Sequence, residues 1–133
     1  MNHHAALIYT MVLVSAADRD MTDRELAVIG DIIGHLPIFQ EFDSDQLPRT
    51  AQECAALLSE GNGLYDVIAT IKEALPVKLR ETAYALACDV AAADSKLSQE
   101  ELRLLEILRH ELEVGRLEAA AIERGTRARF MRV

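Results

Sequence analysis

The chain contains VSAADRDMTDREL at residues 14–26 and, 76 residues later, VAAADSKLSQEEL at residues 90–102. The two stretches share a valine, two alanines, an aspartate, a glutamate and a leucine at equivalent positions, and the Met/Leu and Thr/Ser pairs match in kind. Two unrelated helical segments would rarely agree in both residue and structural position. We therefore infer an internal duplication, which predicts two helix–loop–helix hairpins related by approximate two-fold symmetry.

Outside these stretches the hydrophobic pattern is helical almost throughout, and no segment shows the two-residue alternation of a strand. Frequent alanine favours helices and lets them approach closely. The sequence therefore predicts a single all-α domain over residues 1–133, a bundle of about seven helices that contains the two pseudo-symmetric hairpins. The expected helices span residues 5–17, 23–35, 44–59, 64–74, 76–93, 99–113 and 116–127.

The charge of the chain is negative and unevenly spread. The formal net charge is −8, but all 22 acidic residues and ten of the 14 basic residues precede Arg124, so residues 1–123 carry −12. Such a body repels phosphate backbones, which predicts no nucleic-acid partner. The arginines of the last ten residues complement the dipole of a helix C-terminus, although a docking role for them is an alternative.

Several residues with reactive side chains receive structural interpretations. Cys54 and Cys88 lie among apolar helical neighbours and are expected to be buried free thiols. His35 and His110 are expected on outward helix faces. His3 and His4 are adjacent near the N-terminus, where disorder is usual, and form a fortuitous pair. No catalytic arrangement or phosphate-binding loop stands out, so we expect no enzymatic activity.

The longest apolar run, residues 5–17, is too short to span a bilayer. It also lacks the charged segment that precedes a signal sequence. These features predict no direct membrane insertion and a cytoplasmic location.

The duplicated loops each contain Asp-x6-Glu, from Asp18 to Glu25 and from Asp94 to Glu101. One interpretation is purely structural. Thr22 and Ser98 stand three residues before the glutamates, and this spacing is that of a capping box. Aspartates likewise suit a loop entered from a helix C-terminus. In this alternative the chain is a metal-independent protein interaction module in which the acids only cap helices.

Helical geometry favours a second interpretation. Glu25 and Glu101 project from the start of the apolar, core-facing stripe of their helices, and a partly buried carboxylate needs compensation. If the hairpins face each other, Asp18, Glu25, Asp94 and Glu101 converge and would coordinate Ca²⁺, Mg²⁺ or Mn²⁺. The loops are not EF-hands, because Asp23 and Gln99 occupy the place of the required glycine.

At these residues the chain resembles the tellurite-resistance TerB-like family, which is related to the N-terminal region of membrane-anchored DnaJ-type co-chaperones. The shared signature is an Ala-rich helix end, an Asp, and a Ser/Thr-capped helix that begins with Glu and Leu. This sequence departs from it at Arg19 and Ser95, where the family commonly has Gly. The resemblance implies an all-helical domain with acidic residues that can bind divalent cations. It also implies a role in tellurite or related stress resistance through a protein partner, which in the family is often membrane-associated, and it implies no known enzymatic reaction.

Overall fold

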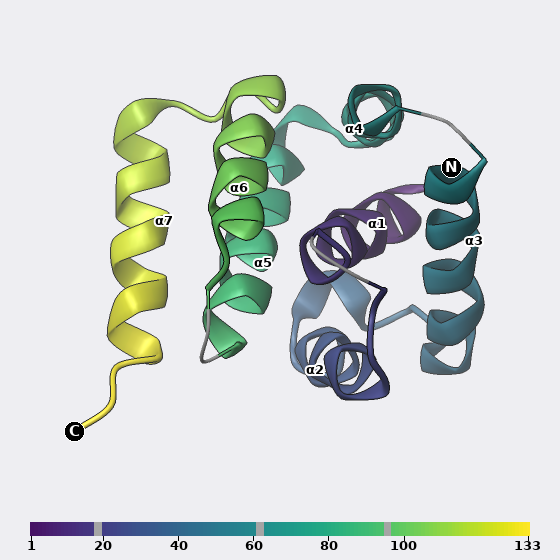
Figure 1. The fold of residues 1–133 in the computed structure, drawn as a ribbon, viewed down its shortest axis with the longest axis horizontal. Coiled ribbons are helices and arrows are strands. Elements are labelled where there is room, and N and C mark those ends of the chain that lie inside the picture. The colour runs from purple at the N-terminus through teal and green to yellow at the C-terminus, as the bar shows by residue number, and fades with distance from the viewer. Residues whose placement is uncertain (18–19, 61–62, 95–96) are drawn as a thin grey trace.

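The computed structural model describes residues 1–17, 20–60, 63–94 and 97–133. Within these residues the chain forms seven α-helices and three short 3-10 turns, and no strand (Figure 1). The all-α prediction is therefore confirmed. The helices are α1 (His3–Ser15), α2 (Asp23–Ile33), α3 (Leu47–Ser59), α4 (Leu64–Ala74), α5 (Arg80–Ala93), α6 (Gln99–Glu111) and α7 (Arg116–Arg129).

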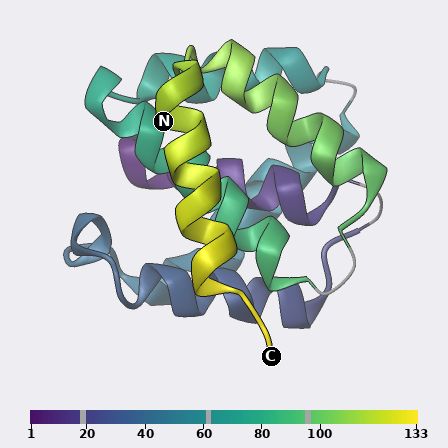
Figure 2. The ribbon, with the colours of Figure 1, turned by 90° about the vertical axis from the view of Figure 1, so that its left-hand side faces the viewer.

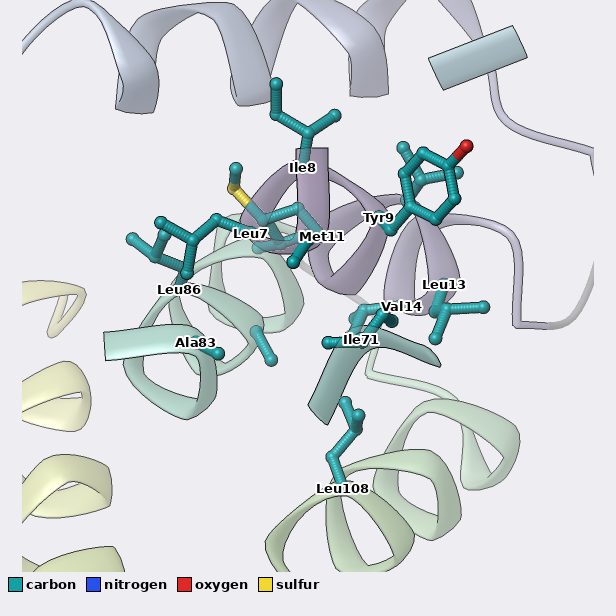
Figure 3. Packing of buried hydrophobic residues seen from close by; sticks show 14 of the residues in the cluster. Leu7, Ile8, Tyr9, Met11, Leu13, Val14, Ile71, Ala83, Leu86 and Leu108 are labelled. Carbon is teal, nitrogen blue, oxygen red and sulfur yellow. The ribbon is translucent and has the colours of Figure 1, made fainter. Parts of the chain in front are cut away.

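Helix α1 forms the centre of the fold. Every residue from Ala6 to Ser15 is buried, and α1 contacts α2, α3, α4, α5 and α6. A helix that is apolar on all sides must be covered on all sides. Figure 3 shows how this is achieved: side chains of α1 such as Met11 and Val14 lie among Ile71 of α4, Leu86 of α5 and Leu108 of α6.

The first helix begins earlier than its hydrophobic pattern predicts. The side chain of Asn2 accepts a hydrogen bond from the backbone N–H of Ala5 at 2.9 Å and caps the helix. The ring of His4 bonds through Nε2 to the carbonyl of Ile38 at 2.7 Å and stacks on Phe39 with ring centroids 5.5 Å apart. The expectation of disorder at His3 and His4 is therefore wrong, because contacts to the α2–α3 connection hold this end.

Other helix boundaries differ from the predictions by four residues or fewer, and local backbone geometry explains the larger differences. Residues 44–46 and 77–79 form 3-10 turns ahead of α3 and α5 instead of their first helical turns. Helix α6 ends at Glu111 because Glu113 adopts a left-handed conformation with φ 57°. The N–H groups of Glu113 and Val114 then bond back to the carbonyls of His110 and Arg109, as in a Schellman motif.

Helix α7 lies on the outer side of α5 (Figures 1 and 2). Three side-chain hydrogen bonds fix it there. The hydroxyl of Tyr84 donates to Glu123 Oε2 at 2.6 Å. Asp89 Oδ1 accepts from Thr126 Oγ1 at 3.2 Å and from Arg129 Nη2 at 2.6 Å. One arginine of the basic C-terminal segment is thus used within the fold.

Candidate functional site

Both predicted capping boxes are formed. At the start of α2, Thr22 Oγ1 accepts from the backbone N–H of Glu25 at 3.1 Å, and the N–H of Thr22 donates to Glu25 Oε1 at 2.8 Å. At the start of α6, Ser98 Oγ accepts from the N–H of Glu101 at 3.1 Å, and the N–H of Ser98 donates to Glu101 Oε1 at 3.1 Å. Each glutamate therefore has a local structural role.

The two glutamates differ in burial. Glu101 is only 5% exposed and lies on the face of α6 that also buries Leu104 and Leu108. Glu25 is half-buried at the start of α2, whose buried residues are Ile29 and Ile33. The prediction that a carboxylate begins each core-facing stripe is confirmed for α6, where Glu101 is buried. In α2 the corresponding carboxylate, Glu25, is only partly buried.

The two hairpins, α1–α2 and α5–α6, line one common pocket of about 120 Å³, which we call the inter-hairpin pocket. Glu25 comes from the first hairpin and Asp94 and Glu101 from the second, so three of the four predicted acids are brought to one place. Asp18, the fourth, lies outside the described residues, as do Arg19 and Ser95. The pocket is lined by Ser15, Thr22, Arg24, Glu25, Val28, Val90, Ala93, Asp94 and Glu101.

Asp94 reaches the pocket because it caps the end of α5 in an extended conformation, with φ −84° and ψ 130°. Its side chain is half-buried. Across the described residues, no three His, Cys, Asp or Glu side chains are grouped closely enough to hold a metal ion by themselves. The acids therefore share a pocket without forming a compact ligand cage.

The sequence interpretation did not include Ser15, the last residue of α1. Its side chain lines the inter-hairpin pocket and is only 2% exposed, and its Oγ has no hydrogen-bond partner. The duplicated motif contains a signal for it, because the equivalent position of the second copy is Ala91. Because alanine fills the equivalent position of the second copy, packing of the helix does not require the hydroxyl of Ser15.

The remaining reactive side chains agree with their structural interpretations. Cys54 and Cys88 are buried free thiols, and burial raises the pKa of each to about 12. Such thiols are protonated and poorly nucleophilic at neutral pH. His35 and His110 are exposed, as predicted.

The comparison with known families agrees with this architecture. A sequence model of the family described as Tellurite resistance protein TerB matches residues 4–124, which is nearly the whole chain. The chain belongs to this family. It matches no curated protein and no solved structure. Among the described residues, no helix combines the length and the apolar character needed to cross a membrane.

Proposed function

We propose that this TerB-family chain is a non-enzymatic domain that binds a divalent cation in the inter-hairpin pocket. In this proposal it acts in tellurite or related stress resistance through a protein partner. The observation that carries the proposal is that carboxylates of two separate hairpins, Glu25, Asp94 and Glu101, line one small pocket. Asp18 remains a predicted further ligand.

The chemistry of the lining fits a hard cation. Among the residues that the structure describes, its polar lining groups are three carboxylates, the hydroxyls of Ser15 and Thr22, and one guanidinium from Arg24. Oxygen ligands of this kind suit Mg²⁺, Ca²⁺ and Mn²⁺ and not softer ions. These carboxylates already make contacts within the protein, and a divalent cation bound among them would offset the repulsion between like charges that remains. The unpartnered Ser15 hydroxyl supports a polar occupant.

The test is calorimetric titration of the full chain with Mg²⁺, Ca²⁺ and Mn²⁺, compared with Glu101→Gln. Glutamine keeps the oxygen that accepts from the Ser98 N–H but removes the charge. We expect the wild type to bind at least one cation and Glu101→Gln to bind at least tenfold more weakly. Glu73→Gln, which removes one exposed acid of α4, is the matched control and should bind like the wild type. No heat with any cation would contradict the proposal.

A metal-independent interaction module is the second candidate, and the two complete capping boxes favour it. In that case the glutamates act only through the helix termini. Partner capture would then be unchanged by a chelator, and Glu101→Gln would behave like the wild type in every assay. Capture of a partner with and without chelator therefore separates the two functions.

A further inference from the structure

A groove lies between helices α6 and α7, with α5 as its floor. Both helices pack on α5, and they diverge from the short connection that joins them (Figure 2). The space between them measures about 370 Å³. We call it the α6–α7 groove and define it by Tyr84, Cys88 and Ala91 of α5, Leu102 and Leu105 of α6, and Thr126 of α7. None of its described lining residues belongs to the inter-hairpin pocket.

The lining of the groove is mainly apolar, and part of it is open to solvent. Leu102 is 40% exposed, and Leu97, which lies just before α6 and lines the same groove, is 44% exposed. Leu105 is half-buried there. Single apolar residues scattered over a surface need no explanation, but leucines gathered in one concave place mark an interaction site. The groove therefore fits the apolar side of a ligand.

Both acids of the groove are already engaged by donors of the chain. Glu106 forms an ion pair with Arg103 at 3.2 Å. The hydroxyl of Tyr84 donates to Glu123 Oε2 at 2.6 Å and so directs this oxygen toward α5. The guanidinium of Arg103 offsets the charge of Glu106. A basic ligand would therefore gain little from these two carboxylates.

The two arginines of the groove have no carboxylate partner among the described residues. Arg109 of α6 donates from Nη1 to the carbonyl of Val114 at 3.4 Å. Exposed Arg127 of α7 takes part in no hydrogen bond or ion pair within the described part of the chain. Residues 116–133 contain five arginines and two glutamates, although the whole chain has a net charge of −8. The groove thus lies beside a basic segment of an acidic protein and favours an acidic ligand.

We infer that the α6–α7 groove docks an acidic amphipathic helix of a protein partner. The apolar side chains of one face of that helix, at helical spacing, enter the groove over Leu102 and Leu105. Acidic side chains beside this face pair with Arg109 and Arg127. A concave groove suits a helix better than a lipid surface, which takes up a protruding apolar face. The inference rests on the protein partner of the proposed function, whereas cation binding in the inter-hairpin pocket is a separate claim.

The test selects peptides on the full chain from a display library. Each peptide has about 16 residues, with leucine at helical spacing and Glu, Gln or Lys at random between the leucines. We expect the selected peptides to be rich in Glu. Selection without enrichment of Glu, or with enrichment of Lys, would overturn the inference.

Variants of the full chain then locate the binding of a selected Glu-rich peptide. Arg127→Glu should weaken it at least tenfold, because charge reversal replaces attraction by repulsion, and Leu102→Glu should weaken it as much by placing a charge on the apolar wall. The matched control is Arg124→Glu, which makes the same charge change at an exposed position of α7 outside the groove. It should bind within about twofold of the wild type. Undiminished binding by either groove variant would place the peptide elsewhere and overturn the inference.

Two further measurements test other occupants of the groove. Sedimentation reports the oligomeric state, and flotation with vesicles of anionic lipid reports membrane binding. A dimer or a vesicle complex that Leu102→Glu abolishes would assign the groove to a second copy or to a lipid surface and overturn the inference. Peptide binding is measured both with Mg²⁺ and with a chelator, and the order of the variants decides. Because Glu101→Gln tests the cation site separately, failure of the groove is distinguishable from failure of cation binding.

Discussion

The α1–α2 and α5–α6 hairpins carry the same motif and the same helix cap, yet they bury different faces of their second helices. Helix α2 buries Ile29 and Ile33, whereas α6 buries Leu104 and Leu108. In the duplicated alignment Leu104 is equivalent to Val28 and Leu108 to Ile32. The buried stripes are thus offset by one residue, or about 100° around a helix.

This offset has a visible origin in the sequence. The position equivalent to Ile33 is Arg109, which donates from Nη1 to the carbonyl of Val114 at 3.4 Å and does not enter the core. The capping boxes are alike because they depend on residues three apart, whereas burial depends on neighbouring helices. The two-fold relation between the hairpins stays a prediction. The side chains that α2 and α6 bury differ between the two hairpins.

The largest effect on stability is expected when an apolar residue of the core-facing stripe of α6 or α2 is replaced by alanine. Leu108→Ala should lower the free energy of unfolding by about 2–5 kcal/mol, because Leu108 is fully buried. Ile32→Ala, at the equivalent but half-buried position of α2, should cost less than about 2 kcal/mol. Urea unfolding followed by circular dichroism measures both. Equal costs would contradict the offset between the stripes.

The second prediction concerns the caps, measured with a chelator present. Glu101→Ala should cost about 1–3 kcal/mol, since it leaves the Ser98 N–H without its acceptor in a half-buried site. Glu25→Ala should cost about 0.5–1 kcal/mol, because water can replace the acceptor at exposed Thr22. The glutamine variants should lie near the wild type. A larger loss for Glu25→Ala would reverse the order expected from burial.

These two comparisons show what the sequence could predict. The capping boxes and the seven helices follow from local spacing and from the position of proline and glycine. The offset of the stripes and the unpartnered hydroxyl of Ser15 also depend on which helices pack together. The differences Ile33/Arg109 and Ser15/Ala91 mark these positions in the sequence, but local patterns do not show which of the groups become buried. The stacking of His4 on Phe39 is a tertiary contact of the same kind. The cap that Asn2 forms is instead local, and a prediction based on the apolar pattern from Ala5 onward did not include it.

The third prediction concerns Ser15, where the duplicated motif of the second hairpin has Ala91. Ser15→Ala in the presence of chelator should raise the free energy of unfolding by about 0.5–1 kcal/mol, because it removes an unpaired buried hydroxyl and introduces a better helix former. Thermal or urea unfolding measures the change. A marked loss of stability would show that the hydroxyl has a structural partner.

The smallest effect is expected from the ion pairs of Glu113, just after the end of α6. Exposed Glu113 contacts Lys72 at 2.7 Å and Arg80 at 3.2 Å, and these cations hold its pKa below the usual value. Because the folded-state pKa is lowered, the stabilisation is present at neutral pH and is lost as the pH falls through that pKa. Glu113→Gln should lower the melting temperature slightly at pH 7 and leave it unchanged in acid, where the carboxyl is protonated. An effect of equal size at both pH values would contradict the electrostatic origin.

The central claim is that the two hairpins build one shared site, and the stoichiometry of cation binding tests it most directly. Calorimetric titration should give one divalent ion per chain, and Glu25→Gln and Glu101→Gln should each weaken that same single site. Two ions per chain, with each substitution removing only one of them, would show that the hairpins bind independently and would contradict the account.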